Sequence, residues 1–154
     1  MTLIVKSIEE AKALEGTELG VSKWILIDQD RINRFAEATD DFQWIHVDTA
    51  RAKAELPIGS TIAHGYLLTA LFPALLEDIV RFEGERAINY GLNKVRFRNM
   101  VPAGSRVRLR TNLKSARKRA GAMQVVLEAI LEIEGQTKPA CVAETIALYF
   151  QSDS

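Results

Sequence analysis

The feature that most constrains the fold is an uncharged segment in the first half of the chain. Between Gly65 and Leu76 the sequence has no charged side chain, and apolar residues continue to Val80. Wound as an α-helix, this segment is apolar on every side, and such a helix must be buried all round. Its uncharged part is too short to span a membrane, which takes about 20 residues. We therefore expect a long central helix wrapped by the rest of the protein, with no membrane insertion.

Pro73 lies inside this segment and bears on its continuity. It lacks the N–H that would bond to the carbonyl of Thr69, so the helix axis should kink there. One alternative is a pair of shorter helices broken near Phe72. Because the apolar cover continues past the proline, the sequence favours one bent helix.

Length and charge narrow the class of protein. The 154 residues predict a single domain over residues 1–154. Twenty basic and twenty acidic side chains cancel, which argues against a general nucleic-acid binder. Charged residues as early as Lys6 and Glu9 argue against a secretory signal. The single cysteine, Cys141, cannot form an internal disulfide, so we expect a cytoplasmic protein.

Two helix starts precede the uncharged segment. Asp28 stands before apolar residues at helical spacing, which predicts an N-cap and a helix that ends near Thr39. Asp48 is a second N-cap candidate, for a short helix over residues 49–55. Residues 17–27 alternate loosely between polar and apolar and predict a first strand.

After Phe82 the apolar residues recur at every second position. The predicted strands cover residues 88–97, 107–113, 123–133 and 140–150. A change of parity near Asn93 predicts a β-bulge, and the last strand is apolar on both faces, as in an interior strand. We therefore predict an α+β protein of the hot-dog type, in which a curved antiparallel sheet wraps a central helix. The alternative is an α+β sandwich with helices across one face.

The loop over residues 38–48 places His46 among apolar side chains and three carboxylates. The carboxylates belong to Asp40, Asp41 and Asp48. A histidine beside a carboxylate is a common general acid–base pair. The alternative, which spacing alone favours, is that the carboxylates cap turns and helices and the histidine is structural. With two histidines and no pair at metal-ligand spacing, we expect no metal site.

Gly65 stands at the start of the apolar helix, where free N–H groups and the positive end of the helix dipole meet. Such N–H groups can hold an oxyanion, and a residue without a side chain lets a ligand carbonyl approach closely. Alternatively, Gly65 merely permits tight packing. His64 is either a ligand contact or a structural hydrogen-bonding residue, and the sequence favours the structural role.

Two motifs carry a family resemblance: residues 41–48 and, after them, residues 62–65. Together they resemble the MaoC-like dehydratases, most closely the branch related to nodulation protein N. The resemblance runs from Trp24 to Phe150 and includes residues 89–97. It implies a hot-dog fold, (R)-specific hydration of trans-2-enoyl-CoA or the reverse dehydration, and a homodimer. The substrate would be a coenzyme A thioester, and no cofactor or metal would be needed.

The resemblance also implies residue roles. Asp41 and His46 match the catalytic aspartate and histidine, and Gly65 matches the backbone oxyanion donor. Substrate contacts would follow the site and the helix start. The candidate substrate-binding residues are Gln43, His64, Tyr66 and Thr69.

Four positions depart from the family pattern. Asp40 stands where many members have glycine, Gln43 where they have asparagine, and Trp44 where they have proline. Ala70 occupies a position that is often serine. The Gln-Trp pair occurs in the nodulation-related branch, so the departures bear on closeness to other hydratases more than on the activity.

Two other functions fit a hot-dog protein. One is an acyl-CoA thioesterase, which also uses a carboxylate near the helix but needs no histidine partner five residues later. The other is a non-catalytic acyl-binding or assembly subunit, which needs neither Asp41 nor His46. Coenzyme A phosphates would require basic residues at the mouth of the site. The candidates are Arg96, Arg98, Arg106, Arg117, Lys118 and Arg119.

Overall fold

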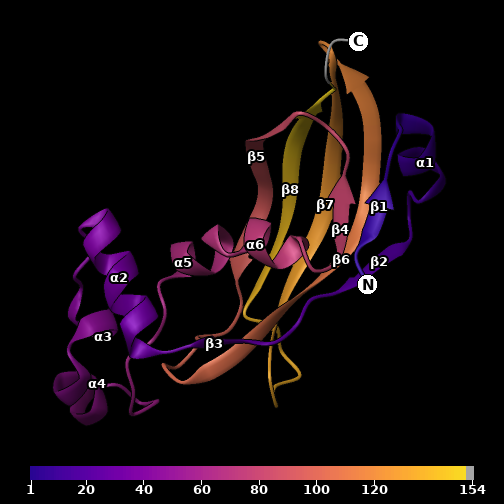
Figure 1. Cartoon of the computed structure of the whole chain (residues 1–154). Helices are drawn as coiled ribbons and strands as arrows, with labels where there is room; N and C mark the ends of the chain where they lie inside the picture. The colour runs from indigo at the N-terminus through magenta and orange to yellow at the C-terminus, as the bar shows by residue number, and fades with distance from the viewer. Residues whose placement is uncertain (152–154) are drawn as a thin grey trace.

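A computed structural model describes residues 1–151 of the chain. Within these residues a six-stranded sheet has the order β2-β6-β7-β8-β5, with β3 also paired to β6. All pairings in this sheet are antiparallel. The strands are β2 (Glu18–Val21), β3 (Ile25–Ile27), β5 (Arg86–Phe97), β6 (Ser105–Arg119), β7 (Ala122–Ile133) and β8 (Cys141–Phe150). The predicted α+β fold is confirmed, and helices lie against one face of the bent sheet (Figure 1).

Alternation along the long strands separates a core face from an outer face. In β6, Val107, Leu109 and Leu113 are buried. Arg108 and Arg110, which alternate with them, both bond to Glu132 of β7, at 2.6 and 2.7 Å. These ion pairs are partly exposed and contribute little to stability, so the core face carries most of the energy of sheet packing.

The helices before the apolar segment begin where the sequence predicts. Asp28 accepts the N–H of Arg31 at the start of α2 (Gln29–Thr39), and Asp48 accepts the N–H of Arg51 at the start of α4 (Thr49–Glu55). Both N-cap predictions are therefore confirmed. The predicted strand over residues 17–27 is interrupted and forms β2 and β3. A register shift between Asn93 and Arg96 confirms the predicted bulge.

The prediction of one long bent helix is wrong. The segment forms α5 (Gly65–Ala70) and α6 (Phe72–Leu76), with Leu71 between them. Pro73 lies in the first turn of α6, where its missing N–H costs least. The alternative of two helices broken near Phe72 is the one that the structure shows.

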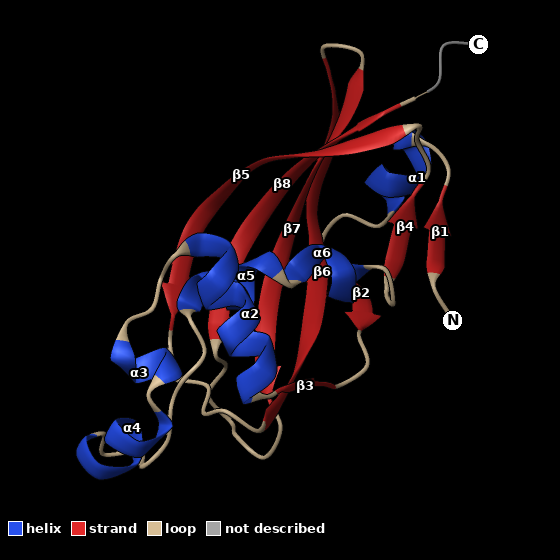
Figure 2. Cartoon of the chain, turned by 60° about the vertical axis from the view of Figure 1, so that its left-hand side comes forward, coloured by secondary structure: helices blue, strands red, loops and turns tan. Residues whose placement is uncertain are grey.

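The same segment is not buried on all sides. Leu68, Leu71 and Leu75 are buried against the sheet, whereas Tyr66 is 75% exposed and Ala70 is also exposed. The expected all-round cover is therefore wrong. The sheet lies along only one side of α5 and α6 (Figure 2).

One pair of short strands was not predicted from the sequence. β1 (Leu3–Val5) pairs in parallel with β4 (Val80–Phe82), so Val80 ends the segment in a strand rather than in a helix. Three-residue strands are too short to show an alternating pattern. The remaining helices are α1 (Ile8–Ala13) and α3 (Trp44–Val47). The helix α3 lies inside residues 38–48, so the prediction of a loop over this whole segment is wrong. None of the helices described here is both long enough and apolar enough to cross a membrane.

Candidate active site

Asp40 ends α2 and directly precedes the site residue Asp41. As the C-cap of α2 it has φ 59° and ψ 22°, the left-handed conformation in which helices commonly end on glycine. A glycine, as in the family pattern that the motif resembles, would adopt this conformation without strain. Similarly, Trp44 is the first residue of α3, a position that tolerates proline because its N–H has no acceptor within the helix.

Replacing Asp40 with glycine is therefore expected to stabilise the fold by up to about 1 kcal/mol. The change removes the strain of a left-handed L-residue, which outweighs the added entropy of the unfolded chain. Urea unfolding would measure it. Asp40→Ala is the control and should destabilise the protein, because alanine keeps the Cβ and lacks the short polar side chain that tolerates this conformation. A glycine variant less stable than the parent would contradict this explanation.

The His46 ring is buried and held by a hydrogen bond. It lies in α3, is 7% exposed, and its Nδ1 is 2.7 Å from the carbonyl oxygen of Ile62. A carbonyl only accepts, so the neutral ring carries its proton on Nδ1 and leaves Nε2 as a free acceptor. Burial lowers the pKa of His46 below its ordinary 6.5, and His64 adds to this, while the bond to Ile62 and the charge of Asp41 oppose it. The ring is thus suited to accept a proton near neutral pH.

The structure brings Asp41, His46 and His64 together. Each offers one polar side-chain atom, and these atoms lie within 4.8 Å of one another. Asp41 is exposed, whereas both histidines are buried, so the cluster joins the surface to the interior. Three groups that are separate in the sequence thus meet at the start of α5.

This cluster is poorly shaped for a metal ion. The rings of His46 and His64 are stacked, with centroids 3.8 Å apart and planes inclined by 22°. An ion bonded by two imidazoles lies in the plane of each ring, and two stacked, nearly parallel planes have no such common point close to both nitrogens. The geometry instead favours a direct stacking contact between the two rings.

Gly65 follows His64 directly and begins α5. A Cβ placed on it would lie 2.9 Å from ring atoms of Phe97, so any side chain here would have to displace that ring. This supports the packing alternative. The N–H of Gly65 is also one of the first-turn donors that have no acceptor within the helix. Both uses of the residue are compatible.

The other predicted site residues are Gln43, Tyr66 and Thr69, and they differ in what they contact. Gln43 is exposed, and its backbone N–H donates to Asp41 Oδ1 at 3.4 Å. Tyr66 points outward, with its ring 6.3 Å from that of Phe97. The hydroxyl of Thr69 donates to the carbonyl of Tyr66. Of these residues, only Thr69 lines the apolar cavity beside α5 and α6.

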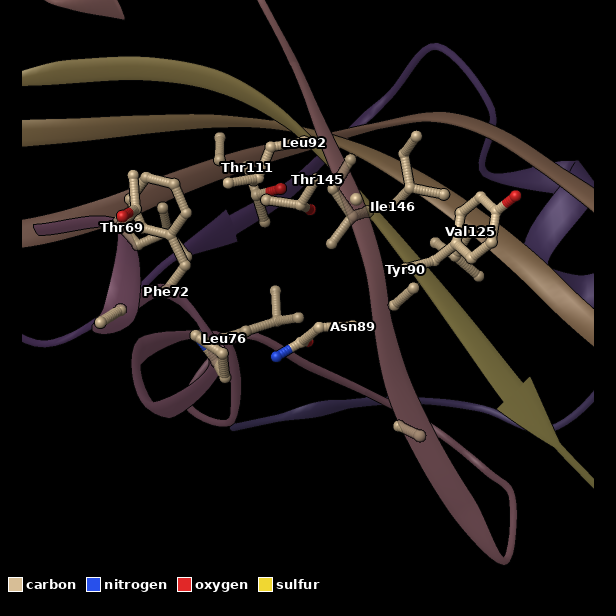
Figure 3. Close-up of a pocket in the computed structure, with 18 of the residues that line it drawn as sticks. Thr69, Phe72, Leu76, Asn89, Tyr90, Leu92, Thr111, Val125, Thr145 and Ile146 are labelled. Carbon is tan, nitrogen blue, oxygen red and sulfur yellow. The ribbon is translucent and has the colours of Figure 1, made fainter. Parts of the chain in front are cut away.

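That cavity has a volume of about 470 Å³ and lies between α5–α6 and the core face of the sheet (Figure 3). Its walls are mostly apolar. They include Phe72 and Leu76 from α6, Leu92 from β5, and Val125 from β7. Neither Asp41, His46 nor Gly65 lines it, but Thr69 lies one helical turn after Gly65. The cavity therefore begins close to the helix start and extends away from the Asp41–His46 cluster.

One supporting residue was missed by the sequence analysis. The side chain of Gln29 donates to the carbonyl of His46 at 2.7 Å and accepts from the hydroxyl of Thr61. It thus ties α2 to α3 and to the segment before α5. A polar residue in the first turn of an amphipathic helix resembles a solvent-exposed one, so no pattern in the sequence signals this role.

Comparison with known proteins identifies the family of the chain. Residues 10–135 match the family described as MaoC like domain. The chain is 47% identical to 3-hydroxyacyl-thioester dehydratase Z of Mycobacterium tuberculosis over 146 residues, which is 94% of this chain and 96% of the relative. It is 46% identical to Nodulation protein N of Rhizobium meliloti over 145 residues, 92% and 90% of the two chains.

Among solved structures, R-Hydratase PhaJ1 from Pseudomonas aeruginosa superposes with a TM-score of 0.69. The match covers 90% of this chain and 83% of that one, at 20% identity. The similarity supports the hot-dog architecture that the strand pattern predicted.

The fold and the 47% identity to a 3-hydroxyacyl-thioester dehydratase define the class: the protein is a hot-dog enzyme and a hydro-lyase. Within that class, it belongs to the MaoC-like dehydratase family, as the two sequence motifs predicted.

Proposed function

We propose that the protein catalyses the (R)-specific hydration of trans-2-enoyl-CoA to (R)-3-hydroxyacyl-CoA, or the reverse dehydration. The observation that carries this proposal is the convergence of Asp41 and His46 within 4.8 Å at the start of α5. The name of the Mycobacterium tuberculosis relative, a 3-hydroxyacyl-thioester dehydratase, supports the substrate class. The R-hydratase neighbour shares the fold and is consistent with it.

In the proposed mechanism, Asp41 and His46 hold one water molecule. The free Nε2 of His46 takes a proton from the water as its oxygen bonds to C3 of the enoyl group. A proton then reaches C2 from the Asp41–His46 pair, which returns to its starting state. Such acid–base help is typically worth about 10²–10⁴-fold in rate.

Charge that builds on the thioester oxygen would be met by the N–H of Gly65. One such donor is typically worth about 2.7–4 kcal/mol. The acyl chain would run from there past Thr69 into the apolar cavity. Proton transfer and a polarised carbonyl suffice for this reaction, so the proposal includes no metal and no cofactor.

The pH dependence of the reaction follows from His46. A protonated ring cannot accept the water proton, so kcat/KM should fall as the pH drops through the pKa of His46. Because burial lowers that pKa, we expect the acid limb of the kcat/KM profile to have an apparent pKa below 6.5. An acid limb clearly above 6.5 would contradict the assignment of His46 as the proton acceptor.

We also propose that the protein is a homodimer formed through the β5 edge. Among the described residues, β5 pairs only with β8 and lies at the margin of the sheet (Figure 1). Along this edge Ile88, Tyr90, Leu92 and Phe97 are 46–49% exposed. A long edge strand with exposed apolar side chains is a ready surface for a second chain.

Ile88→Lys is expected to weaken this dimer, because a charge on an edge strand opposes further pairing. Light scattering after size exclusion should give twice the mass of one chain for the parent and a shift towards one chain for the variant. Leu26→Lys is the matched control, since Leu26 is 49% exposed but lies in β3. A parent protein that is monomeric at micromolar concentration would contradict the proposal.

Crotonyl-CoA tests the proposed activity against the thioesterase alternative. Hydration removes the enoyl absorbance and leaves the thioester intact, whereas a thioesterase releases free thiol. We expect loss of absorbance without thiol, with (R)-3-hydroxybutyryl-CoA as product. Thiol release would favour the thioesterase, and no reaction with enoyl thioesters of several chain lengths would favour a non-catalytic acyl-binding subunit.

A further inference from the structure

His64 is a fully buried polar residue beside the site, and the proposed mechanism gives it no task. It is 2% exposed and occupies the N-cap of α5 without making a side-chain cap bond. Its ring lies between two others: it stacks on His46 at 3.8 Å and meets Phe35 of α2 at 4.9 Å. A residue so placed contacts both the element that carries His46 and the helix that leads to Asp41.

The polar atoms of His64 are used unequally. Nε2 is 3.0 Å from the carbonyl oxygen of Asp41, which can only accept, so Nε2 carries the proton of the neutral ring. Nδ1 is buried and has no hydrogen-bond partner among the described residues. A phenylalanine would fill this space without an unpaired buried nitrogen. Unpaired buried polar atoms are rare and commonly mark a functional constraint.

We propose that His64 is a positioning residue of this site. Its Nε2–H holds the backbone of Asp41, and its ring face fixes the plane of the His46 ring, so that the two side chains converge. The proposal rests on the reacting roles of Asp41 and His46. It replaces the expectation of a substrate contact, because a ring enclosed by His46 and Phe35 offers no face to a substrate.

The composition of the chain makes this arrangement directly measurable. It contains two histidines, His46 and His64, and both belong to the cluster. Long-range ¹H–¹⁵N spectra of the imidazoles therefore report only on the site. In the parent protein we expect His64 protonated on Nε2 and His46 on Nδ1. The opposite tautomer of His64 would overturn the proposal without any variant or substrate.

Two substitutions of His64 separate the role of its hydrogen bond to Asp41 from the role of its stacking on His46. His64→Gln keeps an N–H near the position of Nε2 but removes the ring. His64→Phe keeps the ring and removes the donor. Phe35→Leu, on the other side of the His64 ring, loosens packing without touching either contact and serves as the control.

In His64→Gln, the midpoint of His46 titration should rise towards 6.5, and the acid limb of kcat/KM should move with it. Burial is the largest cause of the lowered pKa of His46, and loss of the His64 ring both reduces that burial and removes one of its two titratable neighbours, the other being Asp41. In His64→Phe, the His46 tautomer should persist while kcat falls by about 10²-fold, as expected when a reacting group is misplaced. Phe35→Leu should lower the melting temperature and leave both the titration and the acid limb in place.

An unchanged His46 midpoint in a folded His64→Gln variant would overturn the stacking role. A His64→Phe variant with kcat within about twofold of the parent would overturn the role of the bond to Asp41. If the protein shows no hydratase activity, the proposed function fails, but the spectra still decide whether His64 orders the cluster. The two failures are therefore distinguishable.

Discussion

Asp41→Asn is expected to lower kcat/KM for enoyl-CoA hydration by about 10²–10⁴-fold while leaving the fold intact. The range is that of general acid–base help. Asparagine keeps the shape of the side chain but removes its negative charge and its capacity to take a proton. Asp41 is exposed, and within residues 1–151 its carboxylate makes only a long 3.4 Å bond to the N–H of Gln43, so stability should change little. Steady-state kinetics with crotonyl-CoA and a melting curve would measure both effects.

His46→Asn is the companion variant and should cost a similar factor. The asparagine amide can still donate to the carbonyl of Ile62, as Nδ1 does, but nothing replaces Nε2. Residues that act as one unit have non-additive effects, so the double variant should be about as slow as the slower single variant. Substantial turnover in either folded single variant would remove that residue from the mechanism.

The second large effect on catalysis is expected for Gly65→Pro, because proline has no backbone N–H. The backbone suits this change: Gly65 is the first residue of α5, where proline is favoured, and His64 has φ −59° and ψ 137°, as residues before proline require. Loss of one oxyanion donor should lower kcat by about 10²–10³-fold.

The neighbouring Phe97 must be included in that experiment, because any Cβ on Gly65 meets its ring. We therefore expect the clearest result in a Phe97→Leu background. There, Gly65→Ala keeps the N–H and should retain most of the activity, whereas Gly65→Pro should lose it. Equal activity in the two variants would show that Gly65 serves packing alone.

Local signals in the sequence were enough to place much of the fold. Asp28 and Asp48 are caps because a short side-chain oxygen in front of an apolar periodic stretch satisfies free N–H groups, and this needs no tertiary partner. The alternating strands were predictable for the same reason, since each strand separates its own core face from its own outer face.

The features that could not be predicted depend on partners that are distant in the chain. Periodicity suggested all-round burial for the apolar segment, but Tyr66 is exposed because the sheet covers only one side. The spacing of Asp41 and His46 identified the pair, whereas their enclosure by His64 and Gln29 arises only in the folded protein. The left-handed backbone of Asp40 likewise depends on where α2 ends, which the residue type alone does not fix.

The site is assembled by hydrogen bonds between separate segments. The N–H of Ile62 donates to the carbonyl of Ile45, and the N–H of Ala63 donates to the carbonyl of Val101. These bonds fix α3 beside the start of α5 and join both to the turn that precedes β6. Because the arrangement depends on them, the relative position of His46 and Gly65 is a property of the whole fold.

The most direct test of the central claim is a crystal structure of the Asp41→Asn variant with bound crotonyl-CoA. We expect the thioester oxygen at about 2.7–3.1 Å from the Gly65 nitrogen, as for an oxyanion donor. We also expect C3 beside a water molecule held by the substituted side chain at position 41 and by His46 Nε2, with the acyl chain directed past Thr69. A thioester bound elsewhere, or one whose C3 faces away from His46, would contradict the proposed mechanism.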